Sequence, residues 1–169
     1  MIQCYIRNYE EGYRYKTDSQ PKLLLIYLLQ GELLLSAPGK WVRLEQGFVG
    51  VFPMGSTVYL ECTKDFKGLY LCDDELSNNE SFQGASGCEG DTALKVVAEL
   101  LRLELLKETL SATVMQSLGV SFFELTKRLL IEQEKPTVKT NESHLKAQKA
   151  LQKMKDNLKG SGIVIESVL

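Results

Sequence analysis

The sequence predicts an α+β protein in which an all-β region is followed by α-helices. Up to about residue 76, short apolar runs are separated by Gly, Pro and Asp roughly every ten residues, which is typical of β-sandwiches and barrels. Residues 77–91 are polar and rich in glycine, which indicates a loop. From residue 92 the apolar positions recur with the period of a helix.

The β region contains runs that alternate between apolar and polar residues, as half-buried strands do. In TVYLEC, Val58, Leu60 and Cys62 share one face, and Tyr59 and Glu61 share the other. We expect the first face to point into the interior. The predicted strands are LLLIYLL, GELLLSA, WVRLE, FVGVF, TVYLEC and FKGLYLC.

Two helices should follow the loop. Asp91 is a suitable N-cap for a helix from Thr92 to about Leu110 that is apolar on nearly every side. Such a helix lies between the β region and another helix, or part of it faces a second subunit. The next helix, from Ala112 to about Gln133, carries Gly119, which suggests a close backbone approach or a kink.

This second helix shows an apolar seam of about two heptads, whose spacing is typical of paired helices. We assign the seam to a dimer interface. The alternative, that it forms intrachain core, stays open because seams of this length serve both uses. The seam residues are Met115, Leu118, Phe122, Leu125 and Leu129.

The C-terminal part differs from the rest in charge. Residues 1–134 have a net charge of −6 and residues 135–169 have +4. Residues 135–142 contain Pro136 within a polar cluster and are expected to be a linker. A third helix is expected from about Ser143 to Leu158, with Lys149, Lys153 and Lys155 largely outside its apolar stripe.

The segment GFVGVFPMG, residues 47–55, resembles a turn of cupin barrels, in which Gly is followed five residues later by Pro-x-Gly. In such barrels a histidine three residues past the second glycine would hold a metal, and here that position is Val58. The resemblance therefore implies a barrel of the jelly-roll type used for packing or binding.

The order of features is similar to that of the AraC family of bacterial transcription regulators. YLLQGELLLSAPGKWVRLEQGFVGVFPMGSTV, residues 27–58, resembles the effector-binding barrel of the family, and HLKAQKALQKMKDNLKGSGIVIESVL, residues 144–169, resembles the start of its first helix-turn-helix unit. Position 164 is valine where the family commonly has a capping serine or threonine. The resemblance implies an effector barrel in 1–91, a helical dimerisation or packing region in 92–134, a linker in 135–142 and a truncated DNA-binding domain in 143–169.

The resemblance also implies partners. The chain would form a homodimer, bind a small-molecule or protein effector in its barrel, and reach DNA through a C-terminal region mostly absent from this sequence. Expected phosphate contacts are Lys149, Lys153 and Lys155. Ligand-binding candidates are Tyr27, Val58, Leu60, Cys62 and Tyr70, although these residues would equally fill a packed core.

Other function classes are disfavoured. The chain has a single histidine, His144, and the β region has none, so we expect no metal, no cofactor and no enzymatic activity. Its four cysteines show no CxxC pair and are expected to be buried thiols of a cytoplasmic protein. No apolar run is long enough to cross a membrane. The alternative function is a dimeric protein-binding module with no role on DNA.

Overall fold

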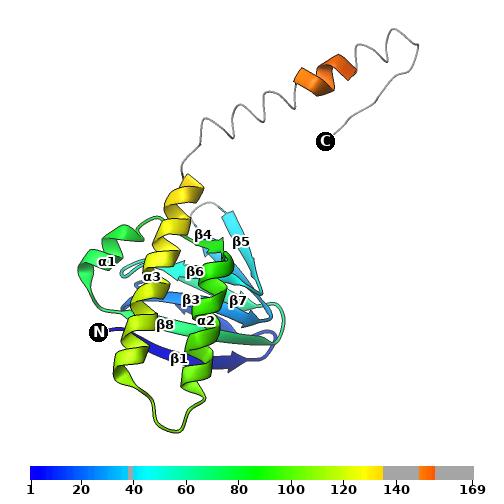
Figure 1. The fold of residues 1–169 in the computed structure, drawn as a ribbon. Helices are drawn as coiled ribbons and strands as arrows, with labels where there is room; N and C mark the ends of the chain where they lie inside the picture. The colour runs from blue at the N-terminus through cyan, green and yellow to red at the C-terminus, as the bar shows by residue number, and fades with distance from the viewer. Residues whose placement is uncertain (38–39, 135–148, 155–169) are drawn as a thin grey trace. The chain divides into compact units, whose positions relative to one another are not determined.

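A computed structural model describes residues 1–37, 40–134 and 149–154 (Figure 1). The chain divides into two units, Met1–Gln133 and Glu134–Leu169, and each is described by itself. The strands of the first unit are β1 (Gln3–Tyr9), β2 (Arg14–Thr17), β3 (Leu23–Gln30), β4 (Glu32–Ala37), β5 (Lys40–Glu45), β6 (Phe48–Phe52), β7 (Val58–Cys62), β8 (Phe66–Asp73) and β9 (Gly87–Glu89). Its helices are α1 (Leu76–Ser81), α2 (Thr92–Leu105) and α3 (Ala112–Glu134).

The strands form two antiparallel sheets. One sheet has the order β1-β8-β3-β6-β9 and the other has the order β2-β7-β4-β5. Along the chain the first eight strands pass back and forth between the two sheets, and only β4 and β5 follow each other within one sheet. The predicted α+β class, with antiparallel sheets followed by helices, is therefore confirmed.

The five-stranded sheet is buried on both faces because it separates two hydrophobic cores. In β3, Leu25 and Tyr27 face the helices, while Ile26 and Leu28 face the other sheet. Figure 1 shows α2 and α3 side by side across the front of this sheet. The alternation predicted for β7 is confirmed, since Val58, Leu60 and Cys62 all belong to the core between the sheets.

Helix α2 begins where the sequence predicts and ends earlier. The Asp91 side chain accepts a hydrogen bond from the Leu94 N–H at 2.9 Å, which is the predicted N-cap. The helix stops at Leu105 rather than near Leu110. The Glu104 carboxylate, in the last turn of α2, accepts hydrogen bonds from two residues beyond the helix, the Ser111 N–H at 3.2 Å and the Lys107 Nζ at 2.8 Å. These bonds stabilise the turn into α3.

The segment 77–91, predicted as a loop, contains two regular elements. Helix α1 ends in it, and β9 pairs with β6, with Cys88 opposite Val49. Both elements are too short to show a periodicity in the sequence. They are stabilised by tertiary contacts instead, such as the hydrogen bond that the Met54 N–H donates to the Asn79 side chain at 2.5 Å.

The seam on α3 lies against the sheet of its own chain. Phe122 is fully buried and contacts Tyr27 edge-on, with ring centroids 6.0 Å apart. A side chain without exposed surface cannot contact a second subunit, so the assignment of Phe122 to a dimer interface is corrected. The other seam residues, Met115, Leu118, Leu125 and Leu129, are partly buried and pack against the same core.

Gly119 marks the close approach that its position in the sequence suggested. A Cβ atom there would lie 3.0 Å from the Cγ2 atom of Ile2. One turn earlier, the Gln116 side chain accepts a bond from the Ile2 N–H at 3.1 Å and donates one to the Ile2 carbonyl at 2.5 Å. These contacts join α3 to the start of the chain, next to β1.

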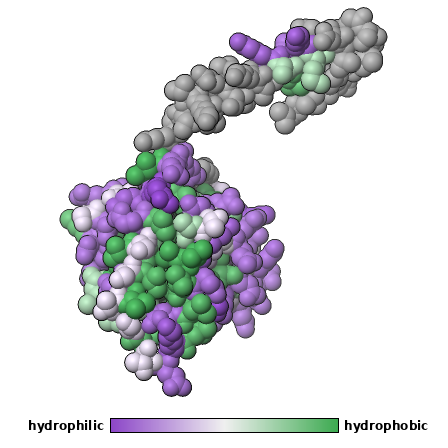
Figure 2. Space-filling view, in the orientation of Figure 1, coloured by the Kyte–Doolittle hydropathy of each residue, from purple (hydrophilic) through white to green (hydrophobic). Residues whose placement is uncertain are grey.

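An exposed apolar stripe runs along α2 on the side away from the core. Val96 is 54% exposed, Leu100 46% and Leu103 44%, and their spacing of four and three residues places them on one face of the helix. Figure 2 shows hydrophobic surface in the middle of the face that α2 and α3 form. We call Val96, Leu100 and Leu103 the α2 stripe.

The second unit is described only at residues 149–154, which are helical. Lys149 and Lys153 are exposed there, whereas Lys155 and the predicted linker 135–142 lie outside the described residues. Within the described ranges, no helix is long and apolar enough to span a membrane.

Candidate small-molecule binding site

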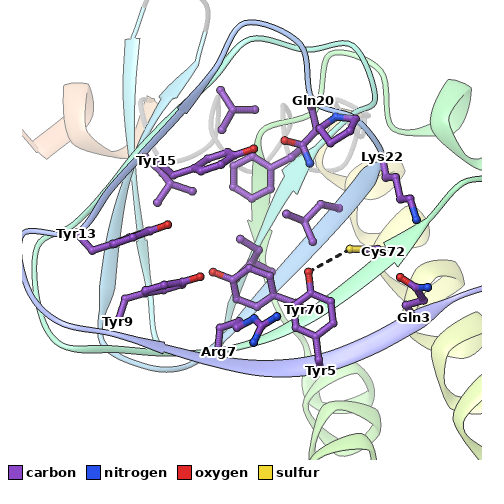
Figure 3. Close-up of a pocket in the computed structure, with 16 residues that line it drawn as sticks. Gln3, Tyr5, Arg7, Tyr9, Tyr13, Tyr15, Gln20, Lys22, Tyr70 and Cys72 are labelled. Atoms are coloured by element: carbon purple, nitrogen blue, oxygen red, sulfur yellow. Dashed lines mark hydrogen bonds between the residues drawn. The ribbon is translucent and has the colours of Figure 1, made fainter.

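A cavity of about 440 Å³ lies between the two sheets, where β1, β2 and the start of β3 meet β7 and β8 (Figure 3). Its apolar wall comes from core residues of both sheets, including Leu24, Ile26, Phe52 and Leu60. This volume falls in the range of small-molecule sites in proteins. The cavity is the candidate functional site.

Tyrosines form much of the cavity wall. Of the seven tyrosines in the chain, five line the cavity: Tyr5, Tyr9, Tyr13, Tyr15 and Tyr70. Alternate side chains of a strand point to the same face, so Tyr5 and Tyr9 of β1 both face the cavity. The Tyr9 and Tyr13 rings stack with centroids 3.9 Å apart, and the Tyr5 and Tyr70 rings stack at 5.3 Å. The wall therefore offers flat aromatic surfaces with hydroxyl groups.

The Tyr5 and Tyr70 hydroxyls keep their protons at neutral pH, because burial raises the pKa of both. Burial, followed by the proximity of Tyr9, raises the pKa of Tyr70. Burial also raises the pKa of Tyr5, whose hydroxyl lies 3.5 Å from the Cys72 Sγ, with either atom able to donate. These groups can give a hydrogen bond or accept one, and they carry no charge.

The rim of the cavity is basic. Arg7 and Lys22 are exposed and line it, and the Arg7 guanidinium carbon lies 4.8 Å from the centre of the Tyr5 ring. Among the described residues, no carboxylate forms a salt bridge with either cation. Asp, Glu and His are missing from the cavity wall as far as the structure describes it. An anion would therefore meet positive charge at the entrance.

Gln20 is the one cavity residue with an unpaired buried polar atom within the described residues. Its backbone is fixed, because its N–H donates to the Ser56 carbonyl at 2.9 Å and its carbonyl accepts from the Gly55 N–H at 2.7 Å. Its side chain is only 6% exposed and lines the cavity, yet its Oε1 atom accepts no hydrogen bond. Buried acceptors are nearly always paired, so this atom is available to a donor in the cavity.

The structure brings together part of the predicted ligand-binding set. Val58, Leu60 and Tyr70 line the cavity. Cys62 lies in the same core between the sheets and does not reach the cavity wall. Tyr27 lies on the opposite face of β3 in the helix-side core, so its placement as an inward-pointing residue is corrected. Tyr27 lies in the run LLLIYLL, which is apolar throughout, so the sequence does not show which of its residues face the helices and which face the other sheet.

Sequence reasoning missed the polar residues of the site. Tyr5, Arg7, Tyr9 and Tyr15 come from β1 and β2, which were not among the predicted strands. A signal was present, because the alternate residues Gln3, Tyr5, Arg7 and Tyr9 share one side of an extended segment. Gln20 precedes Pro21 in a loop and had no signal.

The Pro-x-Gly corner has the structural role that its residues suggested. Gly47 and Gly55 have positive φ angles of 87° and 82°, a conformation that side chains disfavour. Val58, at the position of a cupin metal ligand, is buried and contributes to the cavity wall. Within residues 1–37, 40–134 and 149–154, no group of three His, Cys, Asp or Glu side chains is placed to hold a metal ion.

Comparison with known proteins gives a likeness in fold. No protein-family model and no curated protein matches the chain. It is similar to the solved structure of a cupin superfamily protein from Desulfitobacterium hafniense, with 18% identity over 44% of this chain and 68% of that one and a TM-score of 0.40. It is also similar to the EutQ protein of Clostridium difficile, with 16% identity over 43% of this chain and 56% of that one and a TM-score of 0.39. A third similar structure is a salicylate 1,2-dioxygenase from Pseudoaminobacter salicylatoxidans, with 18% identity over 43% of this chain and 21% of that one and a TM-score of 0.39.

The molecule is therefore a pair of antiparallel sheets with helices packed on one face. Its site differs from a metal centre in composition, since tyrosines, two rim cations and one unpaired amide oxygen surround the cavity.

Proposed function

We propose that this chain is the sensing part of a transcription regulator of the AraC type, in which the cavity between the sheets binds a small molecule and the helices form a homodimer. The observation that carries the binding role is the cavity itself, with its stacked tyrosines and the unpaired Gln20 oxygen. The regulatory role rests on the order of barrel, helix pair, linker and basic segment in the sequence.

Binding without catalysis is the proposed use of the cavity. The groups on its wall are tyrosine hydroxyls, two amides and apolar side chains, together with two cations at the rim and the Cys72 thiol. Such groups orient a ligand by hydrogen bonds and stacking. General acid–base chemistry near neutral pH typically uses groups such as His, Asp or Glu, and burial raises the pKa of Tyr5 and of Tyr70.

The α2 stripe is the proposed dimer surface. Val96, Leu100 and Leu103 are exposed side by side, while the α3 seam is occupied by contacts within the chain. Burying exposed leucine and valine side chains in a symmetric contact would gain about 25 cal/mol for each Å² of apolar surface. The lysines Lys149 and Lys153 remain proposed phosphate contacts in a longer chain.

A thermal-shift screen tests the binding role. We expect at least one compound of a metabolite panel to raise the melting temperature of the wild type, since a ligand at 100 times its Kd adds about 2.7 kcal/mol of stability. Leu24→Trp, which fills the cavity, should abolish this response. Leu29→Trp is the matched control, because Leu29 lies on the same strand and packs into the other core. An equal loss in both variants, or a response that survives Leu24→Trp, would contradict binding in this cavity.

The coding sequence beyond Leu169 tests the regulatory role. The proposal requires two helix-turn-helix units to follow. A stop codon directly after Leu169 would leave the binding role intact and remove the regulatory one, and the chain would then be a dimeric binding module without a DNA role.

A further inference from the structure

We infer that the ligand of the cavity is a flat aromatic carboxylate that also carries a hydroxyl or amino group on the far side of its ring. This inference rests on the proposed binding function and adds the chemical class of the ligand. Three independent features of the wall carry it: the charge at the rim, the aromatic surfaces, and the unpaired acceptor.

The charge at the rim selects an anion. Arg7 and Lys22 line the cavity, no carboxylate within the described part of the chain neutralises them, and the wall there contributes no acidic side chain. Arg7 is held in place by its position over the Tyr5 ring, 4.8 Å from the ring centre. A guanidinium binds a carboxylate through two parallel hydrogen bonds, so Arg7 is the expected carboxylate partner.

The tyrosine rings select a flat body. Tyr9 and Tyr13 are nearly parallel, with 10° between their planes, and Tyr5 and Tyr70 are inclined by 26°. The rings of each pair stack on one another, and a flat ring of the ligand would pack against their outer faces and edges, by offset stacking or edge to face. Ile26, Phe52 and Leu60 add apolar groups to the cavity wall.

The unpaired acceptor selects the second polar group. The Oε1 atom of Gln20 is buried and accepts no bond, so a ligand that supplies an O–H or N–H there gains a hydrogen bond that the free protein lacks. Figure 3 shows Gln20 and Arg7 on opposite sides of the cavity. A donor placed opposite the carboxylate on one ring fits this arrangement, as in 4-hydroxybenzoate.

Titration calorimetry with four probes tests the class. The probes are 4-hydroxybenzoate, benzoate without the donor, 4-hydroxybenzamide without the charge, and octanoate without the ring. We expect 4-hydroxybenzoate to bind most tightly, and the loss of the donor or of the charge to weaken binding by about tenfold each.

Two variants locate the contacts. Gln20→Met should abolish the preference for 4-hydroxybenzoate over benzoate, and Arg7→Gln should abolish the preference over 4-hydroxybenzamide. Lys16→Gln is the matched control and should change neither, because Lys16 is exposed on β2 and does not line the cavity. Circular dichroism of each variant verifies that it is folded.

The outcomes separate this inference from the proposed function. Equal binding of the amide or of benzoate, tighter binding of octanoate, or unchanged preferences in the variants would overturn the aromatic carboxylate. If none of the four probes binds while another compound raises the melting temperature of the wild type and not of Leu24→Trp, the inference fails and the sensing function stands. If nothing binds in either experiment, both fail.

Discussion

At the scale of single residues, the site contains one buried side-chain acceptor that has no hydrogen-bond partner within the described residues, the Oε1 atom of Gln20. The backbone N–H and carbonyl of Gln20 are both hydrogen-bonded, whereas its side-chain oxygen has no partner. A folded protein that leaves a buried acceptor unpaired loses free energy, typically about 1–3 kcal/mol. Binding sites tolerate such losses where a ligand restores the bond.

Gln20→Met should therefore stabilise the ligand-free protein. The substitution keeps the length of the side chain and removes the buried amide, so we expect the free energy of unfolding to rise by about 1 kcal/mol. Urea unfolding measures the change. Gln3→Met, at an exposed position on the same cavity, should have little effect. A decrease in stability on Gln20→Met would show that the amide is satisfied in solution.

The cysteines make stability depend on pH in the alkaline range. All four are free, and burial raises the pKa of Cys62 and of Cys88 from 9.0 to about 11 and that of Cys4 to about 12. The folded state then holds these protons more tightly than the unfolded state. Stability is fully present below pH 9 and falls as the pH rises from 9 through about 11, because unfolding lets the thiols ionise.

Urea unfolding at pH 8, 9 and 10 checks this dependence. The wild type should lose stability over this interval, and Cys62→Val should lose less because it lacks one of the raised thiols. Identical pH profiles for the two proteins would contradict a buried, protonated Cys62.

At the scale of elements, α2 has two apolar sides with different roles. Leu94, Ala98 and Leu101 are buried against the sheet, whereas the α2 stripe is exposed. The sequence showed that the helix is apolar nearly all round, and it left open whether a helix or a second subunit covers the outer side. The structure packs the α3 seam against the core of its own chain and leaves the α2 stripe exposed, and we therefore propose the stripe as the dimer surface.

Two aspartate substitutions distinguish these roles. Leu100→Asp should convert a dimer to a folded monomer, because Leu100 is exposed in the single chain. Leu125→Asp should instead lower the free energy of unfolding by about 3 kcal/mol, because it places a charge against the helix-side core. Sedimentation and urea unfolding measure the two effects. A monomeric wild type at tens of micromolar, or a dimer that survives Leu100→Asp, would contradict the proposed interface.

The N-cap of α2 provides a local test of the fold. Asp91 accepts the Leu94 N–H and its carboxylate also lies 3.8 Å from Arg128 on α3. Asp91→Ala should lower the free energy of unfolding by about 1 kcal/mol, most of it from the lost cap. Asp91→Ser, which retains a capping oxygen, should recover most of the loss. Equal stability of Asp91→Ala and the wild type would contradict the cap.

The predictable elements were those with a strong local pattern. Alternation in TVYLEC placed three buried residues correctly, and Asp91 marked the start of α2. Helix α1 and strand β9 could not be predicted, since their few residues are held by pairing with β6 and by the Asn79 side chain. The cavity was predicted in part, through Val58, Leu60 and Tyr70. Tyr5, Tyr9 and Tyr15 could not be placed with them, because they join the cavity through the antiparallel pairing of β1 with β8 and of β2 with β7.

At the scale of the whole molecule, the first unit is a double sheet with a cavity and an exposed apolar stripe in different places. Between the sheets lies the cavity, and outside the helix layer lies the α2 stripe. Strand β3 separates the two, with Ile26 facing the cavity and Leu25 and Tyr27 facing the helices.

The tyrosines allow the most direct measurement of binding. The ring carbon next to the hydroxyl of every tyrosine can be labelled with carbon-13 and observed by NMR while ligand is added. If a small molecule binds in the cavity, the resonances of Tyr5, Tyr9, Tyr13, Tyr15 and Tyr70 should shift most. Tyr27 in the helix-side core and Tyr59 beside Trp41 are internal controls and should shift little. Seven unchanged resonances, or shifts led by Tyr27 and Tyr59, would contradict the cavity as the binding site.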